Sequence, residues 1–217
     1  NRFNFIKGDI GDSNLVQSID YDVVVNFAAE THVTRSINNS EEFINNDIVQ
    51  LDKLLRTALF NKKLKIFVQI STSEVYGSSY NGLNMSEEHP LNPMSPYAAA
   101  KCGADRMVYS YSKTYDLPAV IIRPFNNYGP KQHLEKLIPR MICCGILNKE
   151  FKIHGDGLAS RDYIHVFDTC NAILKLIDNY SSISEVDAYN IGSDSSISVI
   201  DILNNIQNHF NNNIKFK

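Results

Sequence analysis

Residues 66–77 read IFVQISTSEVYG, an apolar run that passes directly into hydroxyl and carboxyl side chains. The run over residues 66–70 is interrupted only by one glutamine, and such runs are typical of strands buried on both faces of a parallel sheet. Thr72, Ser73 and Glu74 follow at the carboxyl end of that predicted strand. In open α/β sheets this edge is where ligands bind, so the stretch predicts a parallel sheet with a functional segment at its edge.

A tyrosine and a lysine stand four residues apart at the start of the next predicted helix. A Ser-Pro dipeptide suits the N-cap and first turn of a helix over residues 96–115, which places Tyr97 and Lys101 on one face. A lysine ammonium favours the phenolate, so we expect it to lower the tyrosine pKa from its ordinary value of about 10. The pair predicts an acid/base group and, with the segment after the strand, indicates a redox site that has an additional carboxylate.

The order of the predicted elements is that of a doubly wound α/β fold, because strands and helices alternate as far as residue 124. Strands are expected at residues 3–10, 23–27, 66–70, 119–122 and 151–154, helices at 46–60, 96–115, 137–147 and 168–177, a turn at 155–157, and an amphipathic tail at 199–210. We expect a parallel Rossmann sheet in residues 1–128 and a smaller mixed α/β region in 129–217. Parts of residues 162–195 are expected to pack back on the first region.

Composition and charge are those of an ordinary globular protein. The chain has 217 residues, 43% of them hydrophobic, and a net charge of −3, which gives no reason to expect nucleic acid or an anionic membrane surface as partner. No apolar run approaches about 18 residues, and the polar start is unlike a signal peptide. The four cysteines lack Cys-x-x-Cys spacing and the six histidines are scattered. We therefore expect reduced thiols in a cytoplasmic protein and no metal site.

Several motifs, in their order along the chain, resemble the extended short-chain dehydrogenase/reductases that act on nucleotide-diphospho-sugars. Within that family the likeness is greatest to the dTDP-glucose 4,6-dehydratases. The matching stretches are residues 27–33, 35–37, 71–77, 96–101, 126–130, 135–139, 155–157, 161–162 and 189–192. A lone Tyr-x-x-x-Lys is weak evidence, whereas this ordered set is specific and extends from the first residues to about Gly192.

The resemblance implies NAD as cofactor and a reaction that oxidises C4 of the hexose, eliminates water across C5 and C6, and returns the hydride to C6. It implies that the Tyr97 phenolate takes the 4-hydroxyl proton, that Thr72 hydrogen-bonds the same oxygen, and that Lys101 also holds the nicotinamide ribose. Glu74 is the implied base at C5. The cofactor contacts carried over from the family are Asp9, Ile10, Phe27, Ala28, Ala29, Tyr97, Lys101, Pro124 and Asn126.

The nucleotide-sugar contacts implied by the resemblance are mostly in the second half of the chain. They are Thr72, Asn127, Glu135, Lys136, Leu137, His154 and Arg161. An imidazole at His154 can stack on the nucleobase, and the Arg161 guanidinium can bind diphosphate oxygens through two parallel hydrogen bonds. The resemblance further implies a homodimer whose product supplies deoxysugars for surface polysaccharide.

The resemblance also implies that part of the fold is missing from residues 1–217. Family members begin with a strand and a Gly-x-x-Gly-x-x-Gly turn whose backbone N–H groups approach the NAD pyrophosphate. That turn and an initiator methionine are absent, and the chain closes in an Asn-rich tail. We therefore expect an internal piece of a longer protein, truncated in its substrate region too, that by itself binds NAD poorly and is inactive.

Four positions depart from the family pattern, one of them Ser195, where an Asn that contacts a phosphate or the sugar is common. Ser73 stands where the dTDP-glucose enzymes usually place the Asp that protonates the departing 6-hydroxyl, while Asn46 and Asp47 replace the usual Thr and Asn. A serine hydroxyl is a poor proton source, and a Thr-Ser-Glu triplet also occurs in GDP-mannose 4,6-dehydratases and in UDP-glucuronate decarboxylases, so both activities stay open. Epimerases of this superfamily usually lack a carboxylate at position 74, which makes an epimerase third. A catalytically silent nucleotide-binding protein is the alternative from another class.

Overall fold

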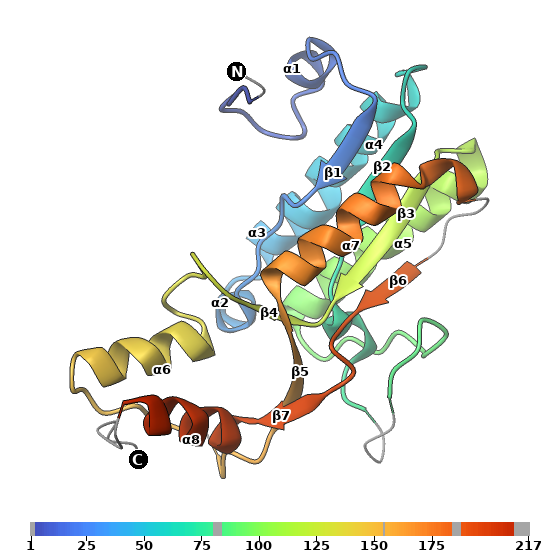
Figure 1. Ribbon diagram of the computed structural model, residues 1–217. Coiled ribbons are helices and arrows are strands. Elements are labelled where there is room, and N and C mark those ends of the chain that lie inside the picture. Colours follow the sequence, from blue (N-terminus) through green and yellow to red (C-terminus); the bar gives the residue numbers. More distant parts are fainter. Residues whose placement is uncertain (1–2, 80–83, 154, 184–187, 211–217) are drawn as a thin grey trace. The chain divides into compact units, whose positions relative to one another are not determined.

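The computed structural model describes residues 3–79, 84–153, 155–183 and 188–210, which form two compact units (Figure 1). Unit 1 comprises Asn1–Pro124 and Ile173–Asn190, and unit 2 comprises Phe125–Ala172 and Ile191–Lys217. In the part of the chain that the structure describes, every helix is too short or too polar to cross a membrane.

The sheet of unit 1 has the strand order β1-β2-β3-β6. Its strands are β1 (Val23–Asn26), β2 (Ile66–Ile70), β3 (Ala119–Pro124) and β6 (Ala188–Ile191). β1 pairs with β2 and β2 with β3, both in parallel, and every residue of β2 is buried. The predicted parallel Rossmann-type sheet is therefore confirmed, and the predicted bounds of β2 agree with the structure to the residue.

Helices cover both faces of this sheet, with α4 (Leu51–Leu59) and α5 (Pro96–Tyr115) on one side and α7 (Val166–Asp178), of which residues 173–178 belong to unit 1, on the other (Figure 1). Before α4 come α1 (Ser13–Gln17), α2 (Val33–Asn38), α3 (Glu41–Ile44) and the π-helix η1 (Asn45–Gln50). The described residues of unit 1 also include two 3-10 helices, η2 (Ser73–Tyr76) and η3 (Tyr180–Ser182). The helix expected at 46–60 is thus present, but its first turn is a π-helix that residue pattern alone did not predict.

The core of unit 1 lies between α4, α5 and the sheet. Apolar side chains from these elements form one cluster: Leu51, Leu54, Leu55, Ala58, Phe67, Ala104, Val108, Tyr111, Leu117, Ala119 and Ile121. Each large apolar side chain buried in this way contributes about 1.5–3 kcal/mol to folding. This packing fixes α5 against β2 and β3, and so fixes the side chains that α5 presents at the carboxyl edge of the sheet.

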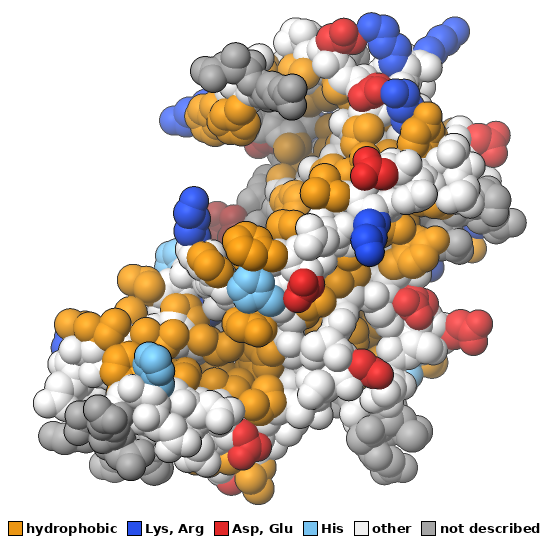
Figure 2. Space-filling view, viewed as in Figure 1, with side chains coloured by type: hydrophobic (Ala, Val, Ile, Leu, Met, Phe, Trp, Pro, Cys, Tyr) orange, Lys and Arg blue, Asp and Glu red, His pale blue; other side chains and the backbone are white. Residues whose placement is uncertain are grey.

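Unit 2 contains a second, three-stranded sheet in the order β4-β5-β7. β4 (Asn126–Tyr128) runs parallel to β5 (Ser160–His165), and β5 runs antiparallel to β7 (Ser196–Ser198). Helices α6 (Leu137–Ile146) and α8 (Val199–His209) pack around buried Met141, Phe151, Ile202 and Leu203. Figure 2 shows further apolar side chains gathered over α6, where Ile146 is 66% exposed.

Two predicted strands are wrong. Residues 3–9 form no strand, and Phe3, Phe5 and Ile6 are exposed, because no described strand pairs with their backbone. The second is the strand predicted at residues 151–154. Phe151 forms a single isolated β-bridge and its side chain is buried in the unit 2 core, whereas residues 152–153 form no strand. The four short strands β4 to β7 were not predicted, because none has an apolar run of its own.

Candidate active site

The segment after β2 is held in a fixed turn at the carboxyl edge of the sheet. Thr72 is the N-cap of η2, and its side-chain oxygen accepts a hydrogen bond from the backbone N–H of Glu74 at 3.2 Å. The turn ends at Gly77 with φ 76°, where an added Cβ would stand 2.2 Å from the backbone oxygen of Asn92. Glycine is therefore required there, and η2 presents Ser73 and Glu74 at the edge, where the sequence predicted them.

Helix α5 places Tyr97 and Lys101 beside this segment. Ser95 caps the helix by accepting a hydrogen bond from the N–H of Ala98 at 3.1 Å. Tyr97 and Lys101 are 8% and 4% exposed, and Nζ of Lys101 donates to the carbonyl oxygen of Ile70 at 2.7 Å. The Tyr97 hydroxyl is hydrogen-bonded to Thr72 and feels the charge of Glu74. The structure thus brings Tyr97 of α5 together with Thr72 and Glu74 of the segment after β2.

The ionisation of Tyr97 differs from the expectation. Burial raises the pKa of Tyr97 to about 12; the hydrogen bond from Thr72 partly opposes this, while the charges of Glu74 and Asp47 add to it. The predicted lowering is wrong, because burial of the phenol outweighs the influences that oppose it; Nζ of Lys101 donates to the Ile70 carbonyl, and burial lowers the pKa of Lys101 as well. At neutral pH this phenol becomes a base only where a further positive charge lies beside it.

Asp47 of the π-helix is a buried carboxyl group near the same pair. It is 2% exposed, its Oδ1 accepts a hydrogen bond from the N–H of Glu30 at 3.0 Å, and its Oδ2 has no partner among the described residues. Burial raises the pKa of Asp47 to about 6, and the charge of Lys101 partly opposes this increase. The site therefore contains a second negative charge, besides Glu74, that a cation can neutralise.

The predicted cofactor residues of unit 1 lie at the ends of β1 and β3 and in the chain before α1. Phe27 is 60% exposed directly after buried Asn26, and Ala28 and Ala29 follow it. Asp9 is exposed and accepts a hydrogen bond from the N–H of Gly11 at 2.8 Å, whereas Ile10 packs on the core. Pro124 is the last residue of β3.

These residues fit a dinucleotide with a cationic ring. An exposed aromatic followed by two small side chains offers an apolar surface that a flat ring can cover. A positive charge beside Tyr97 would lower its pKa and would stabilise the unpartnered Oδ2 of Asp47. Oxidised nicotinamide has that charge.

The remaining predicted cofactor contact, Asn126, and the first predicted sugar contact, Asn127, are adjacent in β4. Asn126 pairs with Tyr163 and hydrogen-bonds its hydroxyl group. Oδ1 of Asn127 accepts a hydrogen bond from Thr169 at 2.6 Å, and its Nδ2 donates to the carbonyl of Phe125 at 3.2 Å. Much of the hydrogen-bonding capacity of Asn127 is used within unit 2.

The other predicted sugar contacts lie at the start of α6 and on β5. Glu135 lies 3.7 Å from His133, Lys136 is the N-cap of α6, and Leu137 packs on the unit 2 core. Arg161 is exposed on β5 and donates from Nη1 to the carbonyl of Ser160 at 2.9 Å. His154 lies outside the described residues. The roles of these residues stay predictions.

Two charged side chains of unit 1 that no sequence motif indicated form a buried ion pair. Asp105 and Arg123 are 0% and 2% exposed and are joined by two hydrogen bonds, at 2.8 and 3.1 Å. Asp105 lies one helical turn beyond Lys101 on the same face of α5, so a count at helical spacing could have found it. Arg123 directly follows the apolar residues 119–122 of the same strand, where an unpaired charge would be costly, so the sequence also indicated that Arg123 needs a buried partner.

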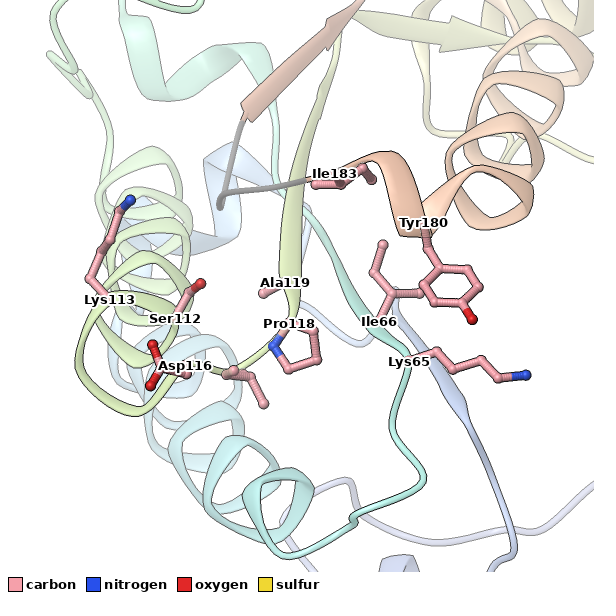
Figure 3. A pocket seen from close by; sticks show the side chains of 10 residues that line it. Lys65, Ile66, Ser112, Lys113, Asp116, Pro118, Ala119, Tyr180 and Ile183 are labelled. Carbon is pink, nitrogen blue, oxygen red and sulfur yellow. The ribbon is translucent and has the colours of Figure 1, made fainter.

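A hollow of about 390 Å³ lies at the opposite, amino end of the sheet (Figure 3). Residues at the starts of β2 and β3, the end of α5 and η3 line it, among them Lys65, Ser112, Asp116 and Tyr180. It contains none of the predicted site residues, and ligands of open α/β sheets gather at the carboxyl edge. We therefore place the candidate site at the edge formed by Thr72 and Tyr97.

The family model described as GDP-mannose 4,6 dehydratase matches residues 1–217, so the chain belongs to that family. A Low-salt glycan biosynthesis protein, Agl12, from Haloferax volcanii is 45% identical over 196 residues, which are 89% of this chain and 62% of that protein.

Solved structures of the same fold include enzymes of two activities. A dTDP-glucose 4,6-dehydratase from Bacillus anthracis, in complex with NAD, has a TM-score of 0.87 at 34% identity and is matched over 98% of this chain and 67% of its own. A UDP-glucuronic acid 4-epimerase from Bacillus cereus, in complex with UDP-glucuronic acid and NAD, has a TM-score of 0.90 at 29% identity, over 100% and 68%. The chain thus spans about two thirds of the length of these solved relatives.

Proposed function

We propose that the full-length protein containing this chain is an NAD-dependent nucleotide-sugar 4,6-dehydratase that converts dTDP-glucose to dTDP-4-keto-6-deoxyglucose. The observation that carries the proposal is the carboxylate of Glu74 beside Thr72 and Tyr97 at the carboxyl edge of β2. NAD, when bound, supplies the acceptor for hydride from C4 and the donor of hydride to C6. An epimerase needs no base at C5, so Glu74 favours dehydration over the activity of the Bacillus cereus relative.

Tyr97 and Thr72 act on the 4-hydroxyl group. Thr72 is hydrogen-bonded to the Tyr97 hydroxyl, so a sugar oxygen placed at Thr72 lies within reach of the phenolic oxygen. With its pKa lowered by a cationic ring, Tyr97 takes the 4-hydroxyl proton. Lys101, whose Nζ donates to the Ile70 carbonyl, is proposed to hold the nicotinamide ribose.

Glu74 and Ser73 act on C5 and C6. Oxidation at C4 acidifies the C5 proton, and the Glu74 carboxylate removes it. The departing 6-hydroxyl then needs a proton. A serine hydroxyl is too weak an acid to supply it alone, so Ser73 relays a proton from water or from protonated Glu74. This division of labour makes Glu74 the residue that separates dehydration from simple oxidation.

In unit 2, Asn127, Glu135, Lys136, Leu137 and Arg161 are proposed to bind the nucleotide-diphospho-sugar, together with His154. The exposed Arg161 guanidinium has donors left for a diphosphate. We further propose that the protein works in the cytoplasm as a homodimer and supplies deoxysugars for glycan synthesis, in keeping with the glycan-biosynthesis role named for the Haloferax relative.

Two activities remain as alternatives within the same chemistry. A UDP-glucuronate decarboxylase would use the same C4 oxidation, and a GDP-mannose 4,6-dehydratase is favoured by the description of the matching family model. Incubating the full-length protein with NAD and dTDP-glucose, GDP-mannose or UDP-glucuronate, with mass spectrometry of the products, distinguishes them. We expect loss of water from dTDP-glucose. Loss of carbon dioxide, water loss only from GDP-mannose, or no change with any sugar would overturn the proposal.

Glu74→Gln tests the assigned base. We expect C4 oxidation to continue while elimination falls by about 10²–10⁴-fold, the range typical of a lost general base. The 4-keto sugar that retains its 6-hydroxyl should accumulate in single-turnover mixtures. Glu41→Gln, which changes an exposed carboxylate at the start of α3, is the matched control. If Glu74→Gln still exchanges deuterium into C5 at the parent rate, Glu74 is not the base.

A further inference from the structure

The carboxylate of Asp105 joins three elements of unit 1 at one buried point. Its Oδ2 accepts hydrogen bonds from Ser71 Oγ at 3.1 Å and from Arg123 Nε at 2.8 Å. Its Oδ1 accepts from Arg123 Nη2 at 3.1 Å and from Arg106 on the solvent side at 2.5 and 2.9 Å. The Asp105 carboxylate, in the middle of α5, is therefore hydrogen-bonded to Ser71 after β2 and to Arg123 near the end of β3.

Arg123 extends this connection to the far end of the η2 turn. Its Nη1 donates to the Tyr76 hydroxyl at 2.8 Å, and the guanidinium lies 5.0 Å from the centre of the Tyr76 ring. The Tyr76 hydroxyl in turn donates to Oδ1 of Asn190 at 2.8 Å, and the N–H of Asn190 donates to Glu87 at 2.7 Å. Tyr76 is 0% exposed and Arg123 is 2% exposed, so the hydrogen bond between them is shielded from bulk water.

The two connections enclose the proposed catalytic segment. Ser71 precedes Thr72 and Tyr76 follows Glu74 by two residues, and both reach the same ion pair, Ser71 directly and Tyr76 through Arg123. Asp105 also belongs to the helix that presents Tyr97 and Lys101. The pair thus ties the ends of the segment to the helix that bears its partners.

We propose that Asp105 and Arg123 are positioning residues that hold Thr72 and Glu74 in register with Tyr97. Ser71 fixes the Thr72 end, which serves C4 oxidation, and Tyr76 fixes the Glu74 end, which serves elimination. The assignment of steps rests on the proposed function. A displacement of about 1 Å can cost a reaction step about 100-fold, so the lost bond at either end has a kinetic signature.

Hydroxyl deletions test the two ends without leaving an unpaired charge. In the full-length protein, Tyr76→Phe should slow elimination by roughly tenfold to a hundredfold and leave C4 oxidation within about twofold of the parent. Ser71→Ala should slow C4 oxidation by roughly tenfold to a hundredfold and leave elimination within about twofold. Arg106→Gln is the matched control, because it removes a bond to the same carboxylate from outside the segment, and both steps should stay within about twofold. Arg123→Lys, which keeps the charge but loses the forked geometry, should slow both steps.

Amide hydrogen exchange separates this inference from the proposed function. Tyr76→Phe should speed exchange in residues 72–76 more than Arg106→Gln does, whether or not the protein dehydrates a sugar. Unchanged exchange in Tyr76→Phe, equal slowing of both steps by both deletions, or the same pattern in Arg106→Gln would overturn the inference. Faster exchange in a protein that releases no water from any sugar would sink the proposed function and leave the positioning role standing.

Discussion

At the carboxyl ends of β2 and β3, Asp105 and Arg123 are 0% and 2% exposed and each charged group has several hydrogen-bond partners. At the amino ends of β1 and β2, Asp22 and Lys65 also form an ion pair, at 2.6 Å, but their side chains are 50% and 48% exposed. The same sheet therefore has a buried, directional pair at one end and a solvated pair at the other. The hollow of Figure 3 lies at the solvated end.

The difference shows which charged side chains of unit 1 are held in fixed positions. A buried pair keeps its partners because leaving one unpaired costs several kcal/mol, about 3–5 in measured cases. A solvated pair is screened by salt and can separate without a large penalty. The candidate catalytic side chains lie at the end where charges cannot separate freely, which is what fixed distances between reacting groups require.

The largest contrast is expected from matched Tyr→Phe changes at the two ends. Tyr97→Phe removes the proposed acid/base at the carboxyl edge and should lower C4 oxidation in the full-length protein by about 10²–10⁴-fold. Tyr180→Phe removes a phenol that lines the hollow at the amino end and should leave oxidation within about twofold. The measurement is the absorbance of reduced nicotinamide in a single turnover with dTDP-glucose. Parent-level oxidation in Tyr97→Phe would reject the assigned site.

Much of the fold could be predicted because its signals are local. The bounds of β2 follow from an apolar run broken only by Gln69, and the start of α5 follows from Ser95 and Pro96; the structure contains the capping hydrogen bond of Ser95. Residues 3–10 show the limit of such signals. Their apolar pattern suits a strand, but a strand also needs a partner for its backbone, and none of the described strands pairs with it.

The candidate site was predicted as a set of neighbours but not as an electrostatic environment. Spacing placed Tyr97 and Lys101 on one face of α5, yet it could not show that the ammonium binds the Ile70 carbonyl. The partner of Arg123 lies 18 residues away on another element, and such long-range pairing leaves no local pattern. Asp47 is buried in a π-helix, a conformation that residue preferences do not specify.

A smaller effect, with a defined pH dependence, is expected from Asp47→Asn. Burial raises the folded-state pKa of Asp47 from 3.8 to about 6, so the folded protein binds more protons than the unfolded chain between these values. The contribution of Asp47 to the free energy of unfolding therefore falls as pH rises from about 4 to above 6. A shift of about two pKa units corresponds to about 3 kcal/mol, so Asp47→Asn should be more stable than the parent by up to that amount at pH 8.

Denaturant unfolding of the full-length parent and Asp47→Asn at several values from pH 4 to pH 8 checks this expectation. The difference in free energy should be smallest at pH 4 and should approach zero only below about pH 3, where the carboxyl group is protonated in both states. Asp105→Asn is an informative comparison at the same edge, because its carboxylate has a full set of partners and its removal should destabilise the protein. A difference at Asp47 that does not change with pH would show that its carboxyl group does not titrate in this range.

The smallest effect is expected at the solvated end, from Asp22→Asn. The hydrogen bond and charge of Lys65 lower the pKa of Asp22 below its ordinary value of 3.8. Because the folded-state pKa is depressed, the contribution to stability is present above about pH 4 and is lost as pH falls through the lowered value, the opposite sign to Asp47.

The side chains of Asp22 and Lys65 are both about half exposed, so water and salt screen most of the attraction. Asp22→Asn should therefore lower the unfolding midpoint at pH 7 by less than Asp47→Asn raises it, and the change should disappear in about 1 M salt. If Asp22→Asn still lowers stability in about 1 M salt, the Asp22–Lys65 pair is not screened by solvent. The contrast between a solvated and a buried ion pair at the two ends of the sheet would then be wrong.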